Sequence, residues 1–231
     1  MKRLSVSMTK AETVWGWIFL PTQLLIIPIV LYAINMVYGS PLNDTQINFA
    51  YFCVNFICAT VIFMHFLKEN GKIALGNVRK CLLSAAKGFC LYFVLSYAVS
   101  ILISALYPEF YNVNDEAINE MVQDNGTLMT IGTVLLVPVV EEVLYRGLVF
   151  QGIHRSSRVG AYIISMGAFA ALHILSYVGM YEPMHLFMCF LQYLPAGFCL
   201  AWAYEQSDSI WAPILIHMSI NQIAMLFMMG G

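Results

Sequence analysis

Ionisable and amide side chains interrupt three strongly apolar stretches in the second half of this chain. They are Glu141, Glu142 and Arg146 in the first stretch, His173 in the second, and His217 and Asn221 in the third. Charged groups inside an apolar membrane segment are costly, so by default they mark a functional site. A carboxylate, two imidazoles and a carboxamide that meet in one cavity are suited to hydrolysis.

In the first stretch, the spacing places two of the charged residues on one helix face and the third on another. Glu142 and Arg146 are four residues apart and therefore share a helix face, where they can form an ion pair. Glu141 points about 100° away and stays free to act on something else. Pro138, one turn upstream, should kink the helix and free a backbone carbonyl near the site. The alternative is that Arg146 snorkels to the membrane surface and both glutamates only anchor a helix end.

The histidines have structural alternatives of their own. His217 and Asn221 share a helix face and can both reach one small polar group, but such a pair can also simply hold two helices together. His173 lies one turn after Phe169, and a single histidine in an apolar helix is often a packing residue. His154, in a turn with Arg155, is expected to be solvated.

Two hydrolytic chemistries fit the main candidates. Glu141 could take a proton from a water that a histidine orients, while the other histidine and the Asn221 amide donate hydrogen bonds to an oxyanion. Alternatively, Glu141, His173 and His217 could hold Zn²⁺ and leave one position open for water. The residue types allow both. The chain has no HExxH motif and no GxSxG motif, and no aspartate lies within an apolar span, so other hydrolase designs are disfavoured.

The composition of the chain indicates the environment in which these residues lie. Of 231 residues, 60% are hydrophobic and 10% are charged, whereas soluble domains are about 25% charged. A net charge of −2 without a basic stripe argues against nucleic-acid binding. The chain is therefore predicted to be an all-α, multi-pass protein of the cell membrane, with the lipid bilayer as its surroundings.

Seven stretches are apolar and long enough to span a bilayer. They are approximately Val14–Tyr38, Ile47–Leu67, Cys81–Tyr107, Thr127–Phe150, Gly160–Tyr177, Met184–Tyr204 and Ile210–Met229. With seven spans, all 11 basic residues fall on one side, which predicts a cytoplasmic N-terminus. Six spans would break this pattern.

The spans divide the chain into three parts. Residues 1–108 form a three-span region without motifs, residues 109–126 an acidic extracytoplasmic loop, and residues 127–231 a four-span catalytic core. The polar segment Lys68–Lys80 joins the second and third spans. The first three spans are expected to shape a cavity or to influence substrate choice.

The motifs together resemble a known family. Glu141-Glu142-xxx-Arg146, Phe169-xxx-His173 and His217-xxx-Asn221 occur in this order and each within an apolar span. This pattern is similar to that of the CPBP intramembrane proteases, also called the Abi or CAAX-protease family, and to type II CAAX prenyl endopeptidases of the bacterial type. The resemblance extends from about Thr127 to Met229.

The resemblance implies a role for each motif residue. Glu141 would activate water with the help of His173, and His217 with Asn221 would form the oxyanion site, while Glu142 and Arg146 would support them. The substrate would be a membrane-associated peptide or protein, and Zn²⁺ remains a candidate cofactor because family members are commonly labelled metalloproteases. The alternatives are a non-catalytic factor of the same fold, acting in bacteriocin self-immunity or as a sensor-kinase partner, and a small transporter.

Overall fold

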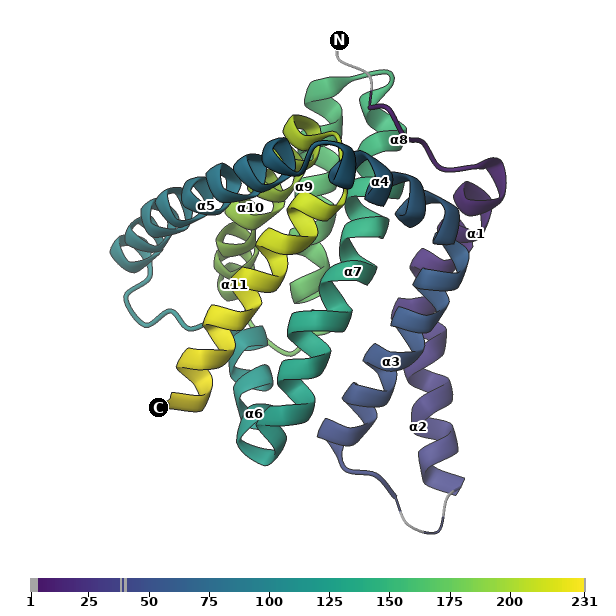
Figure 1. Ribbon diagram of the computed structural model, residues 1–231. Helices are drawn as coiled ribbons and strands as arrows, with labels where there is room; N and C mark the ends of the chain where they lie inside the picture. The colour runs from purple at the N-terminus through teal and green to yellow at the C-terminus, as the bar shows by residue number, and fades with distance from the viewer. Residues whose placement is uncertain (1–3, 38, 40, 231) are drawn as a thin grey trace.

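The structure is a computed structural model that describes residues 4–37, 39 and 41–230 (Figure 1). Its regular elements are helical, and the described residues contain no β-sheet, only an isolated bridge between Val178 and Tyr181. The first half comprises α1 (Lys10–Pro21), the π-helical η1 (Thr22–Ile26), α2 (Ile27–Val37), α3 (Asp44–Ile62), α4 (Met64–Gly76) and α5 (Val78–Leu106). The second half comprises α6 (Val113–Thr130), η2 (Ile131–Leu136), α7 (Val137–Glu142), η3 (Val143–Phe150), α8 (Gln151–His154), α9 (Arg158–Leu175), α10 (Pro183–Ser207) and α11 (Trp211–Gly230).

Seven helical segments of the described chain are long and apolar enough to cross a membrane, which confirms the predicted number. They are Lys10–Val37, Asp44–Ile62, Val78–Leu106, Val113–His154, Arg158–Leu175, Pro183–Ser207 and Trp211–Gly230. The chain is thus an all-helical, multi-pass membrane protein. The cytoplasmic placement of its N-terminus stays a prediction.

The segment 109–126 is not the loop that its polarity predicted. Most of it belongs to α6, which bends at Asn125 (φ −152°, ψ 84°) and continues through η2, α7 and η3. The Asn112 side chain caps α6 by accepting hydrogen bonds from the Asn114 and Asp115 backbone N–H groups. Val122 is buried against a small cluster with Met129. One apolar face is enough to dock a polar helix.

The second span also ends earlier than predicted. The α3 helix stops at Ile62, the chain bends at Phe63 (φ −104°, ψ 23°), and most of the polar segment Lys68–Lys80 is helical within α4 and the start of α5. The carboxylate of Glu12 supports this bend by accepting the Phe66 N–H at 2.7 Å. The other oxygen of Glu12 accepts the Thr9 N–H at 2.8 Å, so this buried acid joins α1 to α4.

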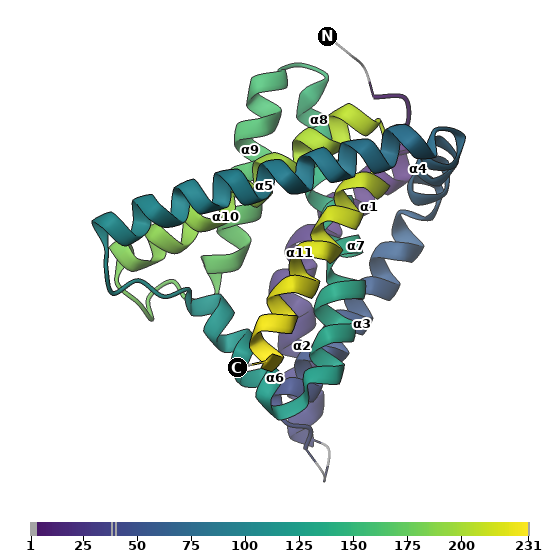
Figure 2. The same ribbon diagram turned by 60° about the vertical axis from the view of Figure 1, so that its left-hand side comes forward.

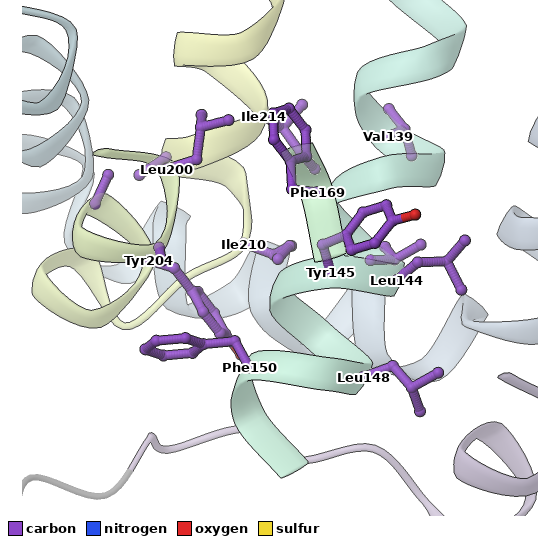
Figure 3. Close-up of a cluster of buried hydrophobic side chains, with 14 of the residues drawn as sticks. Val139, Leu144, Tyr145, Leu148, Phe150, Phe169, Leu200, Tyr204, Ile210 and Ile214 are labelled. Carbon is purple, nitrogen blue, oxygen red and sulfur yellow. The ribbon is translucent and has the colours of Figure 1, made fainter. Parts of the chain in front are cut away.

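The helix that carries the first motif lies at the centre of the bundle. All eight residues of η3 are buried. They pack against α9, α10 and the start of α11, as the cluster of apolar side chains in Figure 3 shows. The α5 and α10 helices lie side by side in both views (Figures 1 and 2). In contrast, the first span leaves many large apolar side chains exposed, as expected for a helix that faces lipid.

His154 differs from the expectation of a solvated residue. It is buried, and its Nε2 lies 3.0 Å from Glu205 Oε1. The same carboxylate accepts two hydrogen bonds from Arg158, at 2.6 and 2.8 Å, and one from Tyr162 at 2.7 Å. This network ties α8 and α9 to the end of α10. The turn between α8 and α9 is therefore held against the bundle.

Candidate active site

Pro138 creates one hydrogen-bonding position of the site. In the π-helical register of η2, the Val137 N–H donates to the Gly132 carbonyl. The next position in that register has no donor, because proline lacks an N–H. The carbonyl oxygen of Thr133 instead accepts from Asn221 Nδ2 at 2.7 Å. The predicted free carbonyl is thus confirmed, and it fixes the Asn221 amide on α11.

Glu142 and Arg146 form the ion pair that their spacing predicted. Arg146 Nη1 donates to Glu142 Oε1 at 3.0 Å, and neither side chain is exposed. Arg146 Nη2 also donates to the Gly197 carbonyl at 3.1 Å, and the guanidinium lies 4.4 Å from the centre of the Phe169 ring. The snorkelling alternative is therefore wrong. Arg146 fixes the first motif against α9 and α10.

His217 lies between the two glutamates of the first motif. Its Nδ1 donates to Glu142 Oε1 at 2.9 Å, and its Nε2 is 3.9 Å from Glu141 Oε2. The sequence predicted only Arg146 as a partner of Glu142, because helical spacing says nothing about a contact across 75 residues. Glu142 therefore orients His217 as well as binding Arg146.

Glu141 presents an unpaired oxygen. Its side chain is 13% exposed, and its Oε2 is buried without a hydrogen-bond partner among the described residues. Buried polar atoms nearly always have a partner, and where the protein offers none, an ordered water is the usual one. The 3.9 Å separation from His217 Nε2 is also longer than a direct hydrogen bond. The geometry around Glu141 therefore suits a bound water.

The two ring nitrogens of His173 differ in their hydrogen bonding. Its Nδ1 lies 2.9 Å from the Phe169 carbonyl oxygen, which can only accept, so Nδ1 carries the hydrogen. In the neutral imidazole, Nε2 then has a free lone pair. The ring lies between the Phe169 and Tyr193 rings, with centroid distances of 4.8 and 4.1 Å.

One cavity brings the predicted catalytic residues together. It has a volume of about 770 Å³, and Glu141, His173, His217 and Asn221 all line it. Glu142 and Arg146 lie behind its wall, in the buried core. The opposite walls come from the first span, α3 and α6, through residues that include Leu24, Pro28, Leu31, Tyr51, Phe52, Asp115, Ile118 and Met121. The first span, which carries no motif, thus shapes the cavity.

The candidate zinc site does not fit this arrangement. No group of three or more His, Cys, Asp and Glu side chains in the described parts of the chain is placed to hold a metal ion. The ligand set Glu141, His173 and His217 lines the cavity but does not converge on one point. Zinc needs donors about 2.0–2.2 Å from a single centre.

Comparison with known proteins agrees with the motifs. Residues 123–223 match the family described as "Type II CAAX prenyl endopeptidase Rce1-like". The segment similar to this family is a little less than half of the chain. The matched segment contains all six residues of the predicted site. It starts within α6 and leaves out α1 to α5.

A more extensive but more distant similarity covers most of the chain. The Bacillus subtilis (strain 168) protein named "Putative membrane peptidase YdiL" is 25% identical over 217 residues, in an alignment that covers 89% of this chain and 82% of that protein. No solved structure matches significantly. The Rce1-like family thus accounts for the motif helices, and this relative extends the similarity toward the first spans.

Two of the polar wall residues that the sequence did not single out are important for the site. Asp115 lies at the start of α6 and Tyr193 lies in the middle of α10, and both line the cavity beside His173. Asp115 was assigned to an exposed loop because its surroundings in the sequence are polar. Tyr193 follows Gln192 in an otherwise apolar helix, and this polar pair was the only available signal.

Proposed function

We propose that the chain is an intramembrane endopeptidase that hydrolyses a peptide bond in a membrane-associated peptide or protein. The observation that carries this proposal is the Oε2 of Glu141, which has no hydrogen-bond partner among the described residues and lies beside His217 on the wall of a large cavity. The similarity of residues 123–223 to the Rce1-like endopeptidase family supports it.

In this proposal, Glu141 and His173 hold the attacking water. The Glu141 carboxylate accepts one proton of the water, and Nε2 of a neutral His173 accepts a hydrogen bond from the other. Proton transfer to Glu141 then generates the nucleophile that attacks the peptide carbonyl. Because Nδ1 of His173 is bonded to a backbone carbonyl, the lone pair of Nε2 is left for this purpose.

His217 and Asn221 stabilise the oxyanion that this attack creates. A doubly protonated His217 donates to Glu142 through Nδ1 and presents an Nε2–H to the cavity. That form also balances the buried charges, since the cluster otherwise holds two carboxylates and one guanidinium. Asn221 has a second N–H besides the one bound to Thr133. Fixed donors of this kind contribute strongly to acyl-transfer reactions.

Collapse of the tetrahedral intermediate breaks the carbon–nitrogen bond. Glu141 returns its proton to the departing amine, so the carboxylate is regenerated and one water is consumed in each cycle. Glu142 and Arg146 do not touch the reacting atoms. Their ion pair keeps His217 oriented and keeps the first motif in place.

The cavity supports cleavage within a chain. Along the described residues, its wall carries the carboxylates of Glu141 and Asp115 and no Lys or Arg. A site that selects a free C-terminal carboxylate would need a cation to bind it, in addition to the His217 that holds the oxyanion. The remaining wall is mostly apolar, with Leu24, Pro28, Leu31 and Met225 among its residues. Such a wall suits a membrane-embedded or lipid-modified segment.

The test uses purified protein in detergent and two internally quenched peptide libraries. One library carries a farnesylated cysteine followed by three C-terminal residues, as the family description suggests, and the other carries a single hydrophobic segment without a prenyl group. We expect the wild type to cleave one of them within the chain, as mass spectrometry of the products would show. Glu141→Gln, which keeps the shape of the side chain, should abolish cleavage while the protein stays folded.

The contrary result would favour the non-catalytic alternative. If the wild type cleaves neither library, or if Glu141→Gln cleaves as fast as the wild type, the proposed mechanism is wrong. Retention of biological activity by Glu141→Ala and His217→Ala would then point to a binding protein that uses the same cavity.

A further inference from the structure

Three contacts hold the imidazole of His173 in place. The Tyr193 ring is stacked on it with an interplanar angle of 24° and a centroid distance of 4.1 Å. The Phe169 ring contacts it at 4.8 Å, and the Phe169 carbonyl binds Nδ1. Two of these contacts come from α9 itself. The third comes from α10, so the position of Tyr193 affects the orientation of His173.

Tyr193 is in turn anchored by the start of α6. Its hydroxyl oxygen lies 3.1 Å from both Asn112 Oδ1 and Asp115 Oδ1, and the single hydroxyl proton is shared between these acceptors. The same oxygen accepts a hydrogen bond from Asn114 Nδ2 at 3.1 Å. The hydroxyl group thus has its full set of partners.

A second contact strengthens this anchor. Asn112 Nδ2 donates to Gln192 Oε1 at 2.7 Å, so the residue that caps α6 also binds α10 one residue before Tyr193. Asp115, Tyr193 and His173 all line the cavity that contains Glu141. A chain of direct contacts therefore runs from the cap of α6 through Tyr193 to one of the proposed catalytic residues.

We propose that Tyr193 and Asp115 are positioning residues of the active site. Tyr193 holds the His173 ring so that Nε2 stays available to the water, and Asp115 holds the Tyr193 hydroxyl. Asp115 and Asn112 precede residue 123, where the family match begins. The anchor therefore lies outside the matched segment. The catalytic consequence rests on the proposed function, but the positioning of His173 can be measured without a substrate.

The first experiment uses nuclear magnetic resonance of protein whose histidine ring carbons are labelled with ¹³C. Comparison with His173→Gln assigns the His173 signal among the five histidines. A proton over the face of an aromatic ring is shielded, so we expect Tyr193→Leu to move the His173 ring signal downfield. Tyr193→Phe and Asp115→Ala, which remove one partner of the anchor, should shift it less. Tyr177→Leu is the matched control, since Tyr177 lines the same cavity but contacts Tyr181, and it should leave the signal unmoved.

The second experiment measures the steady-state kinetics of the same variants on a peptide that the wild type cleaves. Misplacement of a catalytic group can cost up to about a hundredfold in rate. We expect Tyr193→Leu to lower kcat by about tenfold to a hundredfold with little change in KM, and Tyr193→Phe and Asp115→Ala to lower it less. A purely structural role would not separate kcat from KM in this way.

The outcomes distinguish the two proposals. If Tyr193→Leu leaves both the His173 signal and kcat unchanged, the positioning proposal is overturned. If Tyr193→Leu does not fold, as size-exclusion chromatography would show, the milder Tyr193→Phe and Asp115→Ala decide the question by the same two criteria. If the wild type cleaves no peptide, the proposed function fails, and the His173 signal alone decides whether Tyr193 positions the ring.

Discussion

The first and fourth spans are both apolar enough to cross a membrane, but the bundle uses them differently. In their most apolar stretches, 56% of the residues are buried in the fourth span and 11% in the first. The fourth span carries the glutamates and lies in the core, whereas the first leaves side chains such as Ile29 exposed. Hydropathy thus identifies a span, and only tertiary packing shows whether it faces protein or lipid. The proposed catalytic residues of the fourth span lie where it is buried, and the lipid-facing span supplies a wall of the cavity.

The largest effect on stability should come from the buried ion pair of the fourth span. Arg146→Ala leaves the Glu142 carboxylate buried beside only His217, which should cost about 3–5 kcal/mol of unfolding free energy. Arg79→Ala is the matched control, because Arg79 is exposed and no ion pair is recorded for it among the described residues. It should change stability by less than about 0.5 kcal/mol. Denaturant unfolding in micelles would measure the stability of both variants. Equal unfolding curves for Arg146→Ala and Arg79→Ala would show that the buried ion pair does not stabilise the fourth span.

An intermediate effect on stability is expected where the fourth span packs against the second span, the neighbour of the first. A Cβ on Gly132, in η2, would lie 2.3 Å from a ring carbon of Phe52 on α3. Gly132→Ala should therefore destabilise the protein by about 1–3 kcal/mol, and adding Phe52→Ala should recover much of that loss. Gly152→Ala, whose Cβ would meet nothing within 4 Å, should be neutral or slightly stabilising. A double-mutant cycle measured by thermal unfolding would test this prediction. If the losses of stability from Gly132→Ala and Phe52→Ala simply add, the two residues do not couple the second and fourth spans.

The smallest effect is expected for substitutions in the lipid-facing first span, and it should appear in KM. Leu31 lines the cavity, and Leu31→Trp should narrow it, raising KM about fivefold with kcat within about twofold, a change of about 1 kcal/mol in binding. Ile29→Trp, two residues away on the exposed side, should change neither constant. Steady-state kinetics on one cleaved peptide would compare the two variants. A large fall in kcat for Leu31→Trp would mean that this span participates in the chemistry and does not only shape the cavity.

Local features of the site were predictable because they depend on helix geometry. The Glu142–Arg146 pair follows from a spacing of four residues, and the free carbonyl near Pro138 follows from the missing N–H of proline. The seven spans follow from hydropathy. These features need no knowledge of how the helices pack.

Long-range features could not be predicted in this way. The bond between His217 and Glu142 joins residues 75 positions apart, and the anchor of Tyr193 joins α10 to a segment whose polarity predicted a loop. A short polar helix becomes stable through contacts with the rest of the bundle. Its role at the site is therefore visible only in the folded chain.

The measurement that tests this account most directly is the cleavage rate of metal-depleted protein, with wild type and Glu141→Gln side by side on the same peptide. The account assigns the chemistry to side chains. It therefore predicts that the wild type keeps its full rate after metals are removed and that Glu141→Gln falls by at least about a thousandfold. A wild type that loses activity on depletion and regains it with Zn²⁺, or an active Glu141→Gln variant, would contradict it.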